Sequence, residues 1–173
     1  MRPLAVFLDR DGVLNVDRPG GVVRPEDFEL LPGALEALAI LARERVPVHV
    51  VTNQANVGRG VVRREVVDEI HRAMLADVRR AGGEIASVHV CYHAPEDGCD
   101  CRKPAPGLLL RAAREHSLDL ARVVLVGDDR RDLEAARAAG AVPVLVRTGK
   151  GAGVEKALAV SPLPPRSGGR AGV

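Results

Sequence analysis

Two aspartates one residue apart, Asp9 and Asp11, are the side chains of this chain best suited to chemistry. They follow the apolar run 4–8 and precede Gly12, a pattern that predicts a buried strand ending in a loop. Carboxylates near a core are costly unless a cation or a reaction uses them. The pair therefore indicates a site for a hard cation such as Mg²⁺, and one carboxylate could attack phosphorus as a nucleophile.

Alternating apolar runs and helix-period segments must position these acids. We expect strands at residues 4–8, 46–51, 87–91, 123–126 and 142–146, and helices at 32–45, 63–81, 104–116 and 131–139. Continuous apolar strands separated by helices indicate a parallel sheet covered on both faces. Right-handed crossovers then give a doubly wound, Rossmann-like α/β fold.

Polar residues follow the expected strands, where parallel sheets place their sites. Besides Asp9 and Asp11 these are Thr52, Asn53 and Gln54; Cys91 and His93; and Gly127, Asp128 and Asp129, while the fifth strand leads into a basic loop at 147–151. If the strands pair as expected, Asp9, Asp128 and the backbone carbonyl of Asp11 could hold one Mg²⁺. The alternative is that Asp-Arg-Asp-Gly is a solvated turn, which the convergence of polar strand ends disfavours.

In a phosphoryl-transfer reaction, these polar residues would have different roles. Asp9 would attack phosphorus, and Asp11 would protonate the leaving oxygen and then activate water. Thr52, Asn53 and Lys103 would supply donors and positive charge around the transferring group.

One histidine and all three cysteines of the chain lie within eleven residues: Cys91, His93, Cys99 and Cys101. Such a set forms a tetrahedral, structural zinc site with no open position for water. The alternative is three free thiols in a loop. Zinc would fold the loop that leads into Arg102 and Lys103. We interpret the other four histidines, at positions 49, 71, 89 and 116, as packing or surface residues.

Composition restricts the remaining functions. The 173 residues predict one domain over 1–160 and a flexible tail over 161–173, rich in Pro, Gly and Ser. A net charge of +2, with no Trp, one Tyr and two Phe, disfavours nucleic-acid partners. No apolar run approaches the roughly 20 residues of a membrane span. We expect a cytoplasmic protein, and the lack of a long exposed apolar stripe favours a monomer.

Four segments in order resemble the haloacid-dehalogenase (HAD) superfamily of phosphohydrolases: 9–15, 52–54, 102–104, and 127–129 with Asp132. The resemblance spans roughly residues 4–148. It implies a HAD-type fold, with Asp9 as nucleophile, Asp11 as acid/base and Asp128 as a Mg²⁺ ligand, and with Thr52 and Lys103 stabilising the phosphoryl group. Asp132 either orients Lys103 or the metal shell, or caps the helix that begins there. Only sixteen residues separate Asn15 from Pro32, so we expect no large cap domain.

The zinc loop followed by Arg-Lys-Pro, the stretch 55–60 and the basic run 145–151 resemble the heptose-1,7-bisphosphate phosphatase group. This resemblance implies Mg²⁺-dependent hydrolysis of the C7 phosphate, with zinc as a structural ion and either anomer possible. It also implies a sugar-phosphate site lined by Asp17, Arg18, Gly20, Asn53, Gln54, Arg59, Arg102 and Lys103.

Other functions remain as alternatives. Histidinol-phosphate phosphatases are similar, although no imidazole-recognising pocket can be identified in the sequence. A non-catalytic zinc module that binds phosphosugars would be expected to lack Asp9 or Asp11, and both are present. One departure from the heptose group is Asp129, which would repel a second phosphate unless it faces away or binds metal.

Overall fold

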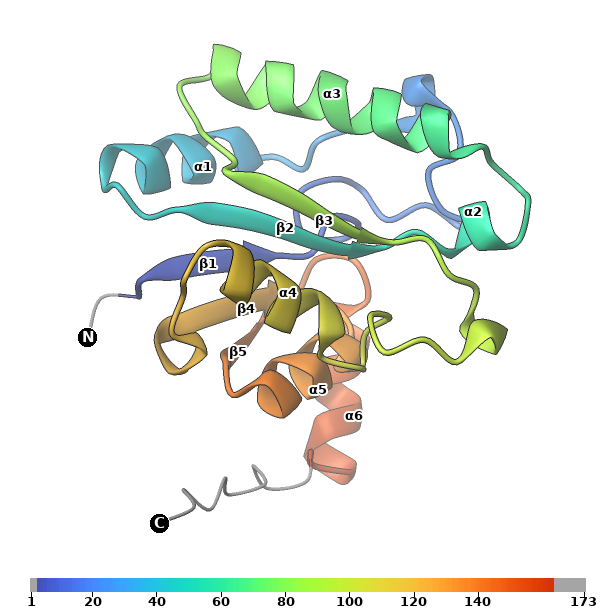
Figure 1. Ribbon diagram of the computed structural model, residues 1–173, viewed down its shortest axis with the longest axis vertical. Coiled ribbons are helices and arrows are strands. Elements are labelled where there is room, and N and C mark those ends of the chain that lie inside the picture. The colour runs from blue at the N-terminus through green and yellow to red at the C-terminus, as the bar shows by residue number, and fades with distance from the viewer. Residues whose placement is uncertain (1–2, 164–173) are drawn as a thin grey trace.

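A parallel sheet of five strands forms the centre of the molecule (Figure 1), in the order β3-β2-β1-β4-β5. The computed structural model describes residues 3–163; most of the tail expected over 161–173 therefore lies outside the described residues. The strands are β1 (Ala5–Leu8), β2 (Val48–Asn53), β3 (Ser87–Cys91), β4 (Val123–Gly127) and β5 (Val142–Leu145). The predicted doubly wound parallel sheet is confirmed.

Helices lie between successive strands, as expected for right-handed crossovers, and one more helix follows β5. They are α1 (Ala34–Arg43), α2 (Ala55–Gly58), α3 (Arg64–Arg80), α4 (Gly107–Glu115), α5 (Arg130–Ala139) and α6 (Gly151–Val160). Between β1 and α1 the chain forms only a loop with a 3-10 turn at Pro25–Asp27, so no cap domain is inserted there.

Alternate residues of the strands supply two separate hydrophobic cores. On one face, Phe7 and Val51 pack with residues of α4 and α5, such as Leu109. On the other face, Val50 packs with residues of α1 and α3, such as Met74. Figure 1 shows α1 and α3 on one side of the sheet and α4 and α5 on the other. Both faces are thus covered, which is why the strands read as continuous apolar runs.

One strand boundary needs correction, and two helices were not predicted. Thr52 and Asn53 belong to β2 instead of following it, because they continue the ladder with β3 through the pairs Thr52↔Val90 and Asn53↔Cys91. Helices α2 and α6 were not predicted. The α6 segment begins Gly-Ala-Gly. Because glycine has a low helix propensity, two glycines in the first turn do not predict a helix.

Strand β1 lies between β2 and β4, so the order in which strands are added to the sheet reverses at β1. Consecutive crossovers run to opposite sides of β1, and a crevice forms at the carboxyl ends of such neighbouring strands. Asp9 follows β1 and Asp128 follows β4, so both acids lie at this point. Within residues 3–163, no helix has the length and hydrophobicity needed to cross a membrane.

Candidate active site

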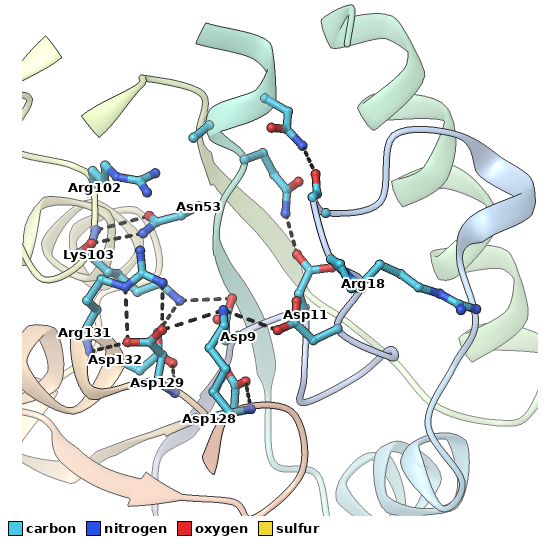
Figure 2. Close-up of a pocket in the computed structure, with 18 of the residues that line it drawn as sticks. Asp9, Asp11, Arg18, Asn53, Arg102, Lys103, Asp128, Asp129, Arg131 and Asp132 are labelled. Carbon is cyan, nitrogen blue, oxygen red and sulfur yellow. Dashed lines mark hydrogen bonds and ion pairs between the residues drawn. The ribbon is translucent and has the colours of Figure 1, made fainter. Parts of the chain in front are cut away.

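A cavity of about 460 Å³ opens at the carboxyl ends of the strands. Eleven of the predicted site residues line it: Asp9, Asp11, Asp17, Arg18, Gly20, Asn53, Gln54, Arg59, Arg102, Lys103 and Asp128. Figure 2 shows Asp9 and Asp132 directed towards Lys103, with Arg131 nearby and Arg18 extending away from this centre. Thr52 does not line the cavity; it is buried beneath it, with 1% of its surface exposed.

Asp9 is held by a lysine and by its own loop. Its Oδ1 lies 3.0 Å from Lys103 Nζ and accepts a 2.7 Å hydrogen bond from the backbone N–H of Arg10. Burial raises the pKa of Asp9 to about 7, although Lys103 opposes the shift. Any further cation beside Asp9 would favour its ionised, nucleophilic form. Both of these bonds go to Oδ1.

Lys103 is buried, with 1% of its surface exposed, yet it carries a charge. Burial acts to lower its pKa, but the carboxylates of Asp9 and Asp132 outweigh burial and raise it. Nζ also donates to the carbonyl oxygen of Val51 at 2.8 Å. With three acceptors the ammonium is fixed in place, which is what pre-organised stabilisation of a phosphoryl group requires.

The Asn53 side chain positions the backbone of Lys103. The Lys103 N–H donates to Asn53 Oδ1 at 3.1 Å, and Asn53 Nδ2 donates to the Lys103 carbonyl at 3.0 Å. These two bonds cross-link β2 to the loop that precedes α4. Asn53 lines the cavity, as predicted for a substrate ligand, but its described bonds serve the lysine.

Asp132 both contacts Lys103 and takes part in the cap of α5. Its Oδ1 lies 2.7 Å from Lys103 Nζ, while its Oδ2 accepts a hydrogen bond from the backbone N–H of Asp129 at 3.0 Å. Asp129 in turn accepts from the N–H of Arg131 and caps α5. The start of α5 and the position of the lysine are therefore coupled through one carboxylate.

Asp11 is surrounded by donors. Arg10 Nη2 donates to both of its oxygens at 2.9 and 3.0 Å, and Asn15 and Gln54 each donate at 2.9 Å. Burial acts to raise the pKa of Asp11, but Arg10 and the hydrogen bonds outweigh it and hold the pKa below its usual value. Gln54 Nε2 also donates to Thr52 Oγ1 at 2.9 Å. Gln54 thus connects two of the predicted catalytic residues.

The carboxylates of Asp9, Asp128 and Asp132 each offer an oxygen within 4.8 Å of the others. Such a group of oxygen donors fits Mg²⁺. Both oxygens of Asp132 already accept bonds, so Asp9 and Asp128 are the acids free to bind an ion. Gly12 and Gly149 both have a positive φ and lie against Asp128. A Cβ on either glycine would collide with the Asp128 carboxylate.

Basic groups surround the acidic centre. Arg18, Arg59, Arg102, Arg131 and Lys150 line the cavity. Arg102 Nη1 is buried without a hydrogen-bond partner among the described residues, and a buried donor of this kind needs an acceptor. A phosphate oxygen would supply one.

The expected repulsion by Asp129 is neutralised. Its carboxylate accepts from Arg131 Nη2 at 2.7 Å, and Lys150 Nζ lies 3.8 Å away. Burial acts to raise the pKa of Asp129, but Arg131 outweighs it and lowers the pKa to about 2. Asp129 therefore carries a paired negative charge.

Among the lining residues that the sequence did not predict, Arg131 and Asn56 carry polar side chains. Arg131 comes three residues after Asp128, and this adjacency to a strand end could have identified it.

The two basic residues of the loop at 147–151 lie in different places. Lys150 lines the cavity, whereas Arg147 lies outside it, 77% exposed and paired with Glu155 at 2.9 Å.

The predicted metal loop brings its four ligand atoms together. The described separations among the Sγ atoms of Cys91, Cys99 and Cys101 and the Nδ1 atom of His93 are 3.2–3.7 Å. A tetrahedral zinc ion with bonds of about 2.3 Å to sulfur separates its sulfur ligands by about 3.8 Å. The four atoms therefore fit one tetrahedral metal ion without rearrangement of the chain.

Comparison with known proteins gives a consistent result. The HAD-hydrolase-like family matches residues 100–164. The D-glycero-beta-D-manno-heptose-1,7-bisphosphate 7-phosphatase of Pseudomonas putida is 42% identical over 146 residues, covering 84% of this chain and 83% of the relative. The enzyme of the same name from Bordetella bronchiseptica is 42% identical over 159 residues, covering 92% and 87%.

Solved structures support the same relationship. The crystal structure of D,D-heptose 1,7-bisphosphate phosphatase from B. bronchiseptica, complexed with magnesium and phosphate, superposes with a TM-score of 0.87. It is 41% identical, and the match covers 96% of this chain and 90% of that one. The enzyme from Burkholderia thailandensis gives a TM-score of 0.69 at 34% identity, covering 94% and 88%. The chain belongs to the heptose-1,7-bisphosphate 7-phosphatase family of HAD-like hydrolases.

Proposed function

We propose that this protein is a Mg²⁺-dependent phosphomonoesterase that removes the C7 phosphate of D-glycero-β-D-manno-heptose 1,7-bisphosphate. The observation that carries the proposal is the 3.0 Å pair between Asp9 and Lys103 beside Asp128 in the cavity. The related enzymes, named for this reaction and this anomer, supply the substrate. Nothing in the comparisons favours histidinol phosphate.

Asp9 and Asp11 have separate roles in the proposed reaction. Asp9 attacks phosphorus and forms an aspartyl-phosphate as the bond from phosphorus to the sugar oxygen breaks, and Asp11 gives its proton to that oxygen. Asp11 then takes a proton from water, whose oxygen attacks phosphorus and releases Asp9 and inorganic phosphate. Asp11 needs a proton for the first step, and the negative charge of an entering phosphate raises its pKa.

Asp9, Asp128 and the backbone carbonyl of Asp11 would hold Mg²⁺. When bound, the ion neutralises negative charge on the phosphoryl oxygens. Lys103 adds positive charge to the same site. Thr52 lies under the site, where its hydroxyl and Gln54 keep Asp11 oriented.

The second phosphate of the substrate needs positive charge away from the acidic centre. Arg59 and Arg102 line the same cavity as Asp9, and the unpartnered Nη1 of Arg102 is a donor for a phosphate oxygen. Arginine suits bidentate phosphate binding better than lysine does. Asp17, Arg18 and Gly20 line the outer part of the site, where the sugar hydroxyls would lie.

Zinc is the metal that we assign to Cys91, His93, Cys99 and Cys101. The ion would fix the loop that leads directly into Arg102 and Lys103, and so aim two cations at the phosphates. The thiols form no disulfide, and thiols are kept reduced in the cytosol. We therefore place the enzyme in the cytoplasm, as a monomer acting on a soluble sugar phosphate.

A comparison of substrates tests the proposal. Phosphate release is measured with the β- and α-anomers of the heptose bisphosphate and with histidinol phosphate, each with and without Mg²⁺. We expect the β-anomer to give the highest kcat/KM and EDTA to abolish turnover. A hundredfold preference for histidinol phosphate would contradict the proposal.

A further inference from the structure

A second cluster of metal-ligating side chains lies away from the cavity. His49, His89 and His116 each place a ring nitrogen within 4.8 Å of the others. His49 lies near the amino end of β2, His89 lies in β3, and His116 directly follows α4. Because β2 runs towards the cavity, His49 is at the opposite end of the sheet from Asn53. The proposed phosphatase reaction uses none of these histidines.

The cluster contains an unsatisfied buried nitrogen. His49 is 1% exposed, and its Nε2 has no hydrogen-bond partner within the described part of the chain. The ring of His116 lies with its centroid 4.3 Å from that of His49. A buried polar atom without a partner costs about 1–3 kcal/mol, so a ligand for this nitrogen would stabilise the fold.

Ser87 lies between two of the imidazoles and contacts both. Its Oγ lies 2.7 Å from His49 Nδ1 and 2.7 Å from His89 Nε2. A hydroxyl oxygen has two lone pairs and can accept an N–H from each ring. Both rings then carry their proton on the nitrogen facing Ser87. This tautomer leaves lone pairs on His49 Nε2 and His89 Nδ1, and such second-shell bonds are characteristic of metal-binding histidines.

From this arrangement we infer that His49, His89 and His116 form a second zinc site, independent of the cysteine loop. Three neutral imidazoles are a known ligand set for zinc, and they leave a fourth position for water or a carboxylate. Glu115 is the available carboxylate, since its Oε2 lies 3.8 Å from His89 Nδ1. Burial and the neighbouring imidazoles keep His49 neutral at pH 7, with a pKa of about 4.

Such an ion would join β2, β3 and the end of α4. His116 and Glu115 are exposed, so zinc can enter from solvent without opening the core. Helix α4 begins soon after Lys103 and ends at this cluster. Zinc there would fasten to the sheet the helix that follows the catalytic loop.

Zinc stoichiometry tests the inference. Purified protein in Mg²⁺-containing buffer is equilibrated with chelator-buffered Zn²⁺, and bound metal is measured by mass spectrometry. We expect two zinc ions per wild-type chain and one in His116→Ala. Because His116 is exposed, this variant should fold and retain the phosphatase rate. Arg114→Ala, an exposed change on the same helix, serves as the matched control and should bind two.

Cobalt distinguishes the two sites. Co²⁺ added to protein with one equivalent of zinc in the cysteine loop should give ligand-field bands without thiolate-to-cobalt charge transfer, and should broaden the imidazole NMR signals of His49 and His89. A wild-type chain that binds a single zinc, or a His116→Ala chain that still binds two, would overturn the second site. Neither readout depends on the heptose substrate, so the result is separate from the proposed activity.

Discussion

Asp132 Oδ1 and Lys103 Nζ lie 2.7 Å apart, and both side chains are almost fully buried. The other oxygen of Asp132 completes the capping box of α5 by accepting from Asp129 N–H. Lys103 is therefore held by a residue in the first turn of a helix. This contact links a helix cap to the lysine that we propose stabilises the phosphoryl group.

Asp132→Asn separates these two contributions. The amide oxygen can still accept from Asp129 N–H, so the cap is kept. The substitution also breaks the buried ion pair with Lys103, so we expect a loss of stability of about 3–5 kcal/mol. The negative charge beside Lys103 is removed, so we expect kcat to fall about 10- to 100-fold. Steady-state kinetics and urea unfolding measure the two effects. Asp119→Asn, at the exposed cap of the 3-10 turn Leu120–Arg122, is the control and should leave kcat unchanged.

Asp9→Asn removes the proposed nucleophile while preserving the size of the side chain. We expect kcat to fall by about 10³-fold or more, with the thermal unfolding temperature near that of the wild type. Trapping of the phosphoenzyme with labelled substrate should give a signal in the wild type alone. Turnover by the variant within tenfold of the wild type would exclude Asp9 as the nucleophile.

Arg102→Ala tests recognition of the second phosphate. Loss of one charge-assisted contact of about 1.5–3 kcal/mol should reduce kcat/KM for the bisphosphate by about 10- to 100-fold. The effect on a heptose that carries only the C7 phosphate should be much smaller. Arg147→Ala is the matched control, because Arg147 lies outside the cavity and pairs with Glu155. Equal losses on both substrates would instead place Arg102 at the transferred phosphate.

His71 should make the fold sensitive to acid. Its Nε2 lies 3.1 Å from Arg10 Nη1, and burial together with Arg10 lowers its pKa from 6.5 to about 4. The unfolded chain therefore takes up a proton between pH 6.5 and 4 that the folded protein excludes. Stability from this group is complete above pH 6.5 and decreases, by up to about 3 kcal/mol, as the pH falls towards 4.

His71→Gln provides the measurement. The glutamine oxygen can accept from Arg10 in place of Nε2, but it does not titrate. Urea unfolding at a series of pH values should show a shallower loss of stability below pH 6.5 than in the wild type. His49 should contribute a similar slope in metal-free protein, so the loss is reduced and not abolished. An unchanged slope would show that His71 is protonated in the folded state.

The sequence by itself determined the sheet and most of the site. Apolar runs and helical periods specify the strands, and parallel strands must bring their carboxyl ends to one edge. Asp9, Lys103 and Asp128 could therefore be placed together from their positions after strands and within motifs. The cluster of Cys91, His93, Cys99 and Cys101 was equally predictable, because these residues are close in sequence.

Tertiary structure decided the pairings between side chains from distant segments. The two contacts of Asp132 depend on how α5 packs beside the loop of Lys103. Arg147 lies outside the cavity because it pairs with Glu155 of α6, a helix that was not predicted because glycine has a low helix propensity. The histidine cluster is the clearest case. His49, His89 and His116 come from three separate elements without a motif, and only the packing of α4 on β2 and β3 brings their nitrogens within 4.8 Å.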